Sequence, residues 1–186
     1  RGFAGARIED IAKHAGLSKG TIYLYFDSKE EMLKALVRRS VSPIAEALKN
    51  IADHVGENPE KKAAEILRSM LMIVGNRLSD NKTSSIPLLI IGEAGNFPEL
   101  AVFYRREVID VTIGALSTVF KRGVKSGEFM KHNADLAIRS LMSIVIMQII
   151  WNGVFASKDD AEISMKSLIN SHLDIFLNGT LRHQEL

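Results

Sequence analysis

Apolar residues recur at three- and four-residue steps along almost the whole chain, and this spacing constrains the fold more than any other feature. Such a period is typical of amphipathic α-helices, and no long alternation of the kind typical of β-strands is present. The chain has 186 residues, of which 46% are hydrophobic, so it can bury a sizeable core. The sequence therefore predicts an all-α fold with about eight or nine helices.

Capping residues and prolines predict where the first helices begin and end. Ser28 and Glu31 form a capping-box pattern at the start of one helix. Pro43 lies inside the apolar run that follows, so we expect a kink or break near Ser42. The pair Asn58-Pro59 predicts the start of the next helix, and the polar residues 79–85 are interpreted as a loop.

Three later helices are predicted from similar signals. Their limits are Pro98 to Ser126-Gly127, Asn133 to about Phe155, and Ser157 (paired with Asp160) to Asn178-Gly179. The second of them is apolar on nearly every side, as expected of a helix that is buried on every side. Its uncharged stretch, residues 140–157, is close to the lower length limit for a membrane span. Because it also contains Ser, Gln, Asn and Gly, burial between protein surfaces explains it better, and no membrane is predicted as a partner.

The composition excludes several classes of chemistry. The chain has no cysteine, which rules out disulfides, thiolate metal sites and cysteine nucleophiles and suits the reducing cytoplasm. The five histidines are scattered, and the sequence has no HExxH, no phosphate-cradling glycine loop and no GxSxG. We therefore expect no catalytic residues, no metal and no cofactor, and an enzyme in the helical body is the disfavoured alternative.

Charge alone does not predict a nucleic-acid partner. The net charge is +2, with nine Lys or Arg against seven Asp or Glu in residues 1–56 and fifteen of each in residues 57–186. The small surplus lies at the front of the chain, but its size is too modest to indicate DNA binding. The pairs Arg105-Arg106 and Lys121-Arg122 are interpreted as solvated charge on a helix.

The stretch RIEDIAKHAGLSKGTIYLYFDSKEE, residues 7–31, carries the most informative pattern. Ile8, Ile11 and Ala12 form one face of a short helix, and Gly16 can adopt a left-handed conformation in the turn that follows. Ser18 can cap a second helix, on which Ile22 faces inward. Two short helices joined by a glycine-containing turn are typical of a helix-turn-helix, whose second helix enters the DNA major groove.

This stretch resembles the DNA-binding signature of the TetR/AcrR family of transcriptional regulators. The likeness is specific over roughly the first 36 residues, where IAKHAGLSKGTIYLYFDSKEEML follows a Gly-aromatic pair, Gly2-Phe3. The stretch EAGNFPELAVFYRREV, residues 93–108, is also similar to the ligand domain of some members. The resemblance implies a helix-turn-helix domain over residues 1–42 and a helical ligand-binding and dimerisation domain over residues 43–186.

The resemblance also implies which residues contact DNA. Thr21 and Tyr23 match positions that touch DNA, Tyr25 and Lys29 match phosphate ligands, and Leu24 can meet a thymine methyl group. Tyr23 and Tyr25 could instead pack in the small core, and Gly20 could be there only to let a neighbouring helix approach. The full set of candidate DNA-binding residues is Arg7, Ser18, Lys19, Gly20, Thr21, Tyr23, Leu24, Tyr25 and Lys29.

Two departures from the family pattern stand at the front of the chain. The family places Thr-Ser or a similar pair ahead of the first helix of the motif, whereas this chain has Ala6-Arg7, so the capping side chain is lost. The family also has a whole helix before this point. We therefore expect the natural protein to have further N-terminal residues before Arg1.

The resemblance implies a homodimer formed by the last two helices, at about 134–156 and 158–178, which bury their apolar faces against a second copy. It also implies an effector pocket among the middle helices, lined by apolar side chains with a few polar groups. Each candidate could equally be an ordinary core residue, and Trp151 could belong to the dimer seam. The candidates are Met70, Val74, Glu93, Phe97, Phe103, Tyr104, Met142, Met147, Gln148, Trp151, Asn152 and Phe155.

The functional hypothesis is a ligand-responsive, one-component regulator, of the repressor type usual in the family. It would bind a palindromic double-stranded DNA operator as a dimer and be released by a small apolar or amphipathic effector. A dimeric protein that holds an apolar ligand without regulating genes is the alternative, and only residues 7–31 distinguish the two.

Overall fold

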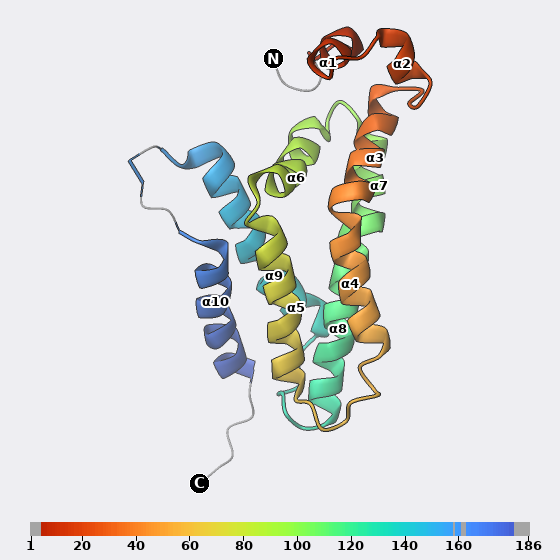
Figure 1. The fold of residues 1–186 in the computed structure, drawn as a ribbon. Coiled ribbons are helices and arrows are strands. Elements are labelled where there is room, and N and C mark those ends of the chain that lie inside the picture. Colours follow the sequence, from red (N-terminus) through yellow and green to blue (C-terminus); the bar gives the residue numbers. More distant parts are fainter. Residues whose placement is uncertain (1–4, 158, 161–162, 181–186) are drawn as a thin grey trace.

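The computed structural model describes residues 5–157, 159–160 and 163–180, and all regular structure in this part of the chain is helical (Figure 1). The π-helical turn η1 joins α7 to α8 and η2 extends α9, so the described residues form nine continuous helices without a β-strand. The all-α prediction is confirmed. The elements are α1 (Ile8–His14), α2 (Lys19–Tyr23), α3 (Lys29–Ser40), α4 (Ser42–Asp53), α5 (Ala63–Leu78), α6 (Asn81–Glu93), α7 (Pro98–Tyr104), η1 (Arg105–Ile109), α8 (Asp110–Lys125), α9 (Ala134–Ile150), η2 (Trp151–Phe155) and α10 (Met165–Thr180).

A small module at one end of the molecule contains α1 and α2 and is joined to the body by α3 (Figure 1). Its own core consists of Ile8, Ala12 and Ile22, with Phe26 and Met32 packed against them. Leu33, one residue later, already belongs to the larger core of the body. The boundary at residue 42 stays a prediction, because α3 contributes to both cores.

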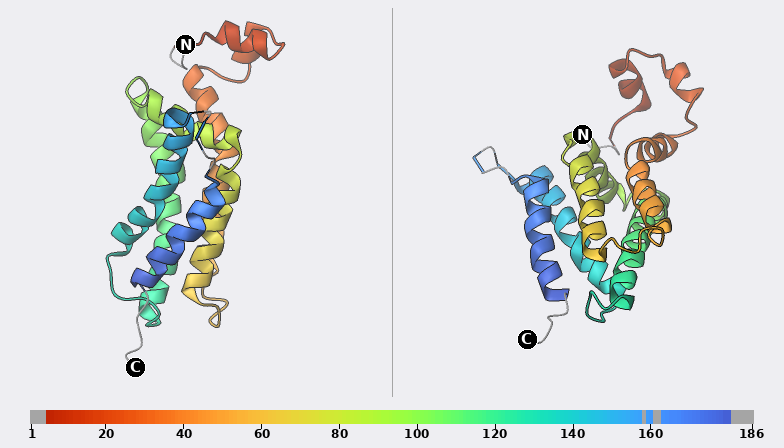
Figure 2. Two further views of the ribbon diagram at one scale, coloured as in Figure 1. Left: turned by 90° about the vertical axis from the view of Figure 1, so that its left-hand side faces the viewer. Right: turned by 60° about the horizontal axis from the view of Figure 1, so that its bottom comes forward.

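The body is a bundle in which α8 packs against α4, α5 and α9 (Figure 2). Leu67, Leu116 and Phe120 are fully buried at its centre. The last helix, α10, packs on α5 and α9 at one side of the bundle. This arrangement surrounds the middle of the bundle with side chains from α4 to α9.

Several predicted helix limits are confirmed by the capping contacts. The Glu31 N–H donates to Ser28 Oγ (3.1 Å) at the start of α3, and the Leu136 N–H donates to Asn133 Oδ1 (3.1 Å) at the start of α9. Val41 separates α3 from α4, and Pro43 occupies the first turn of α4, as expected for a break near Ser42.

The predicted helix start at Asn58-Pro59 is wrong, because α5 begins at Ala63. The Glu128 carboxylate caps this helix from across the bundle, accepting the N–H groups of Ala63 (2.7 Å) and Ala64 (3.0 Å). The cap is therefore supplied by a residue from the distant loop after α8, not by the neighbouring asparagine.

Arg122 holds the segment before α5 in a non-helical conformation. Its guanidinium donates to four backbone carbonyl oxygens at 2.6–3.1 Å, those of Val55, Asn58, Pro59 and Lys61. The interpretation of Arg122 as solvated charge is therefore wrong. Arg105, Arg106 and Lys121 are exposed, as predicted.

The predictions for two further helix starts are also wrong, one made from polar composition and one from a capping pattern. Residues 81–85, interpreted as loop, belong to α6, where Asp80 accepts both the N–H (3.1 Å) and the hydroxyl (2.8 Å) of Thr83. These hydrogen bonds hold the pKa of the Asp80 carboxyl below its usual value. Ser157 and Asp160 form a turn instead of starting the last helix, which begins at Met165 and is capped by Ser164.

Candidate functional site

The helix-turn-helix has the local geometry that its sequence predicts. Gly16 has a φ of +69°, so the turn between α1 and α2 uses the left-handed conformation that favours glycine. Ser18 caps α2, accepting the Thr21 N–H at 3.0 Å, and the two hydroxyl oxygens lie 2.8 Å apart. The start of the expected recognition helix is therefore held by its own side chains.

Three large side chains at the end of α2 and just after it are exposed. Leu24 is 82% exposed, Tyr25 77% and Tyr23 45%, while Ile22, which precedes them, is buried in the small core. The two tyrosines therefore do not fill this core, which was the alternative explanation for them. Exposed apolar and aromatic groups at such a position are suited to contacts with a partner.

Gly20 has no packing reason within the described chain to be a glycine. A Cβ atom built on it would meet only Ser18 Oγ, at an ordinary contact distance of 3.7 Å. No neighbouring helix of the described residues approaches it, which removes one of the two explanations for this glycine. The open backbone at the start of α2 is instead accessible to a partner from outside.

The charged candidates are held by partners within the module. Lys19 forms an exposed ion pair with Glu9 and lies 5.8 Å from the centre of the Tyr23 ring. The hydrogen bond between the two charged groups raises the pKa of Lys19 and lowers the pKa of Glu9. The Lys29 ammonium donates to the Ala6 carbonyl oxygen (2.9 Å) and so ties the start of α3 to the segment before α1.

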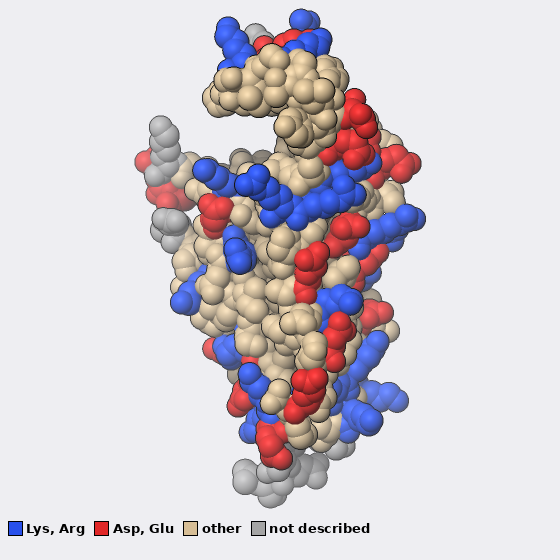
Figure 3. Space-filling view, turned by 45° about the vertical axis from the view of Figure 1, so that its right-hand side comes forward, with Lys and Arg blue, Asp and Glu red and all other residues tan. Residues whose placement is uncertain are grey.

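Arg7 is exposed at the N-cap position of α1, and its side chain makes no capping hydrogen bond. This was expected, because Ala6-Arg7 replaces the capping pair that the family has here. At the outer end of the module, Lys and Arg side chains are mixed with Asp and Glu (Figure 3). The module therefore carries no uniformly basic face in this view. Local groups on α2, not net charge, define the candidate DNA interface.

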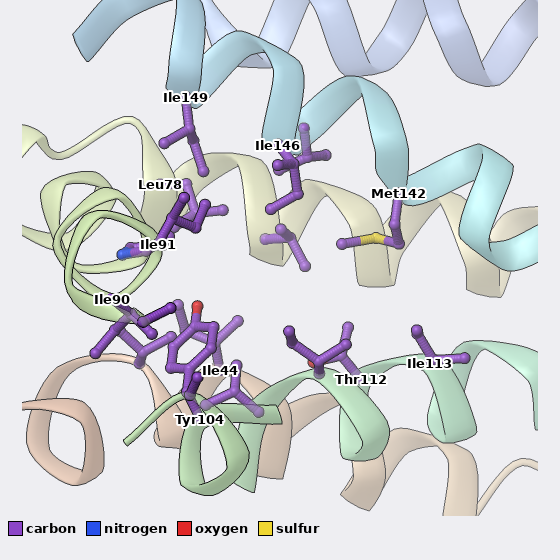
Figure 4. Close-up of a pocket in the computed structure, with 18 residues that line it drawn as sticks. Ile44, Leu78, Ile90, Ile91, Tyr104, Thr112, Ile113, Met142, Ile146 and Ile149 are labelled. Carbon is purple, nitrogen blue, oxygen red and sulfur yellow. The ribbon is translucent and has the colours of Figure 1, made fainter. Parts of the chain in front are cut away.

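A second candidate site is a cavity of about 320 Å³ in the body. Helices α4 to α9 and the π-helical turn η1 all contribute to its wall (Figure 4). Its volume is in the range of pockets that hold small organic molecules. π-Helical turns often occur at functional sites, and here η1 contributes Val108 and Ile109 to the wall.

The cavity wall is apolar except for two hydroxyl groups. Tyr104 is largely buried, and its hydroxyl points into the space between the helices, while Thr112 lies further along the same wall (Figure 4). Burial raises the pKa of Tyr104 to about 12, so the phenol is neutral at physiological pH. None of the described residues that line the cavity is Asp, Glu, Lys, Arg or His.

Three of the predicted ligand-binding residues line this cavity, namely Val74, Tyr104 and Met142. Met70 lies in the solid core, and Phe97 and Phe103 pack against that core without reaching the cavity. Phe103 instead lies under the cations of α3, with the Arg38 guanidinium 4.9 Å and the Lys34 ammonium 5.9 Å from the ring centre.

The remaining predicted ligand residues also lie outside the cavity. Glu93 is buried and accepts the Asn96 amide (3.0 Å), and the buried Gln148 donates to Asn152 (2.7 Å). Met147, Trp151 and Phe155 are exposed on the surface of the single chain. Sequence reasoning missed other lining residues, among them Ile44, Leu78, Ile90, Thr112, Ile146 and Ile149.

The surface of α9, η2 and α10 exposes a group of large apolar side chains. They are Leu136, Ile146, Met147, Trp151, Val154, Phe155 and Ile175, and Ile163 just before α10 is exposed as well. Residues Ala134–Phe155 are also long and apolar enough to cross a membrane, although a core helix passes the same test. In the structure α9 packs against α6, α8 and α10.

Comparisons with known proteins match both parts of the chain. Residues 1–36 match the family of bacterial regulatory proteins of the tetR type, and residues 65–179 match the C-terminal domain of AefR-like transcriptional repressors. The second match covers more than half of the chain. The chain therefore belongs to the TetR family of transcriptional regulators.

Individual relatives are similar over nearly the full length. A fatty acid metabolism regulator protein of Bacillus subtilis is 24% identical over 96% of this chain and 87% of its own. A TetR-family regulator from Mesorhizobium loti superposes with a TM-score of 0.74 at 18% identity, covering 97% of this chain and 89% of that one. The fatty acid degradation regulator FadR of Bacillus halodurans gives 0.66 at 23% identity, covering 98% and 88%. The two structures show the fold.

Proposed function

We propose that this protein is a cytoplasmic, ligand-responsive repressor that binds a palindromic DNA operator as a homodimer and is released by a small apolar or amphipathic effector. The observation that carries the proposal is the pairing of an exposed, capped α2 with an apolar cavity in the same chain. The repressor assignment is supported by the description of the family matched by residues 65–179. The naming of a relative as a fatty acid regulator supports an effector with a hydrocarbon body.

The candidate DNA contacts are those of the recognition helix and its surroundings. Ser18, Lys19, Gly20 and Thr21 open α2, where helix N-termini meet base edges and phosphates in this class of motif. Gly20 lets the backbone approach a phosphate closely, and Leu24 is exposed enough to reach a thymine methyl group. Arg7, Tyr25 and Lys29 flank them as phosphate ligands, and Tyr23 contacts DNA beside them.

A short path connects the cavity to the DNA-binding module. Tyr104 lines the cavity, and the preceding residue, Phe103, packs under Lys34 and Arg38 of α3. A ligand that favours one position of α7 would therefore favour one position of α3. Such a ligand can change DNA affinity only by binding one arrangement of the chain more tightly than the other.

Fluorescence anisotropy with DNA from the promoter next to the gene tests the DNA-binding part. We expect salt-dependent binding, and Lys29→Ala should weaken it similarly for all sequences, whereas Leu24→Ala should change the sequence preference. Lys13→Ala, an exposed lysine of α1 outside the proposed contacts, is the matched control. If the folded protein binds no DNA from this locus at low salt, the proposal is wrong and the alternative of a non-regulatory ligand carrier gains support.

A further inference from the structure

We propose that the effector is an uncharged molecule with a hydrocarbon body and one hydrogen-bonding oxygen, a ketone or ester, which accepts a hydrogen bond from the Tyr104 hydroxyl inside the cavity. This inference rests on the proposed function, since it assigns the chemistry of the same effector site. It goes further in one respect, because it excludes free carboxylates as the preferred ligands.

The first argument is the absence of any charged partner for an anion. The described residues that line the cavity are aliphatic apart from Met142, Pro87, Tyr104 and Thr112. Transfer of an ionised carboxylate into such surroundings is strongly unfavourable unless a cation or several donors compensate it. The cation that adjoins the lining residue Tyr104 along the chain, Arg105, is exposed and pairs with Asp110 (3.7 Å) instead of lining the cavity.

The second argument is the Tyr104 hydroxyl itself. It points into the cavity and makes no hydrogen bond with another described residue (Figure 4). The phenol is protonated at neutral pH, and burial raises its pKa further, so the group is a neutral donor that suits a carbonyl oxygen. The hydroxyl oxygen is accessible from the cavity, so a ligand oxygen that accepts its hydrogen bond gains both affinity and orientation.

The third argument concerns Thr112, the other polar side chain of the wall. It is also buried and has no hydrogen-bond partner among the described residues. Because η1 lies between α7 and α8, Thr112 and Tyr104 both reach the cavity from what is otherwise one helix. The two hydroxyls can serve one ester or two oxygens of a single ligand, whereas a purely hydrocarbon ligand would satisfy neither.

The test compares two ligands with the same number of carbon atoms, one with a neutral ketone and one with an ionised carboxylate as its head group. Isothermal titration of the full chain at neutral pH with decan-2-one and with decanoate measures both affinities under the same conditions. We expect the ketone to bind at least about ten-fold more tightly than the carboxylate. Operator binding is measured in parallel, because it tests the proposed DNA-binding function separately from the identity of the ligand.

Variants test the role of the hydroxyl. Tyr104→Phe should lower the affinity for decan-2-one about five- to ten-fold, since it removes one neutral hydrogen bond and keeps the ring. Ser117→Ala is the control, because it deletes a buried α8 hydroxyl that bonds Asp135 and does not line the cavity. Met142→Lys, with its fold checked by circular dichroism, should reverse the preference in favour of decanoate.

The outcomes separate the two proposals. If decanoate binds the unaltered protein as tightly as the ketone, the neutral effector is excluded while the ligand-responsive regulator stands. If Tyr104→Phe leaves the ketone affinity unchanged, the proposed hydrogen bond is excluded. If neither ligand binds, the inference fails, and retained operator binding would show that the DNA-binding function does not fail with it.

Discussion

At the scale of single residues, Arg122 shows that one side chain can fix the conformation of a whole loop. Its four carbonyl contacts hold the loop between α4 and α5. Substitution Arg122→Met should lower the free energy of unfolding by about 1–3 kcal/mol, because charged hydrogen bonds are lost and carbonyl groups are left without their donor. Urea denaturation followed by circular dichroism measures this change.

Lys121→Met is the matched control for Arg122, since Lys121 is the adjacent cation of α8 and is exposed. We expect it to change the stability by less than about 0.5 kcal/mol, as is usual at the surface. Equal effects of the two substitutions would mean that the carbonyl contacts of Arg122 contribute nothing measurable.

The residue scale also shows what the sequence could and could not predict. The caps at Ser28 and Asn133 and the left-handed Gly16 were predictable, because each depends on residues within three positions. The Glu128 cap of α5 was not, since its partners lie more than sixty positions away. The capping pattern at Asn58-Pro59 was a real local preference, but tertiary contacts outweighed it.

At the scale of elements, α8 offers a comparison between two glycines of one helix. A Cβ atom on Gly123 would lie 2.3 Å from the Phe129 ring and 2.9 Å from Ala63 Cβ. Gly123→Ala should therefore destabilise the protein by about 1–3 kcal/mol through overpacking. Thermal unfolding of the purified protein measures the loss.

Gly114 provides the opposite expectation on the same helix. It is exposed, and nothing lies within 4 Å of a Cβ atom built there. Gly114→Ala should raise the stability by about 0.5–1 kcal/mol, because alanine loses less conformational freedom in a helix. A gain at both positions would show that the close packing of α8 against Phe129 does not constrain residue 123.

The cavity was harder to predict than the helices that enclose it. Helical periodicity indicated which side chains are apolar along each helix, but it did not show which of them face a space and which fill the core. Met70 and Val74 lie one turn apart on α5, yet only Val74 reaches the cavity. The π-helical turn η1 adds a further difficulty, because it shifts the register between Tyr104 and Thr112 in a way that ordinary periodicity does not indicate.

At the scale of the whole molecule, the apolar surface of η2 and α10 is the main feature that a single chain leaves unexplained. The sequence predicted that residues 134–156 are buried on every side, yet Trp151 and Phe155 are exposed in the single chain, with their ring centres 6.2 Å apart. Ile175 on α10 is exposed as well. A second copy related by a two-fold axis would cover this surface, as the proposed dimer requires.

Phe155→Asp tests this dimer, because Phe155 is 62% exposed in the single chain and its substitution should not disturb the core. Each copy would lose burial worth about 1.5–3 kcal/mol, and two-fold symmetry doubles the loss, so the dimer should dissociate at least about 100-fold more readily. Analytical ultracentrifugation measures the assembly, and Trp151, the one tryptophan of the sequence, reports the exposure of the surface by its emission. Leu24→Asp, at an even more exposed apolar position in the DNA-binding module, should abolish operator binding and leave assembly unchanged. A Phe155→Asp protein that remains dimeric with unaltered tryptophan emission would place the interface elsewhere.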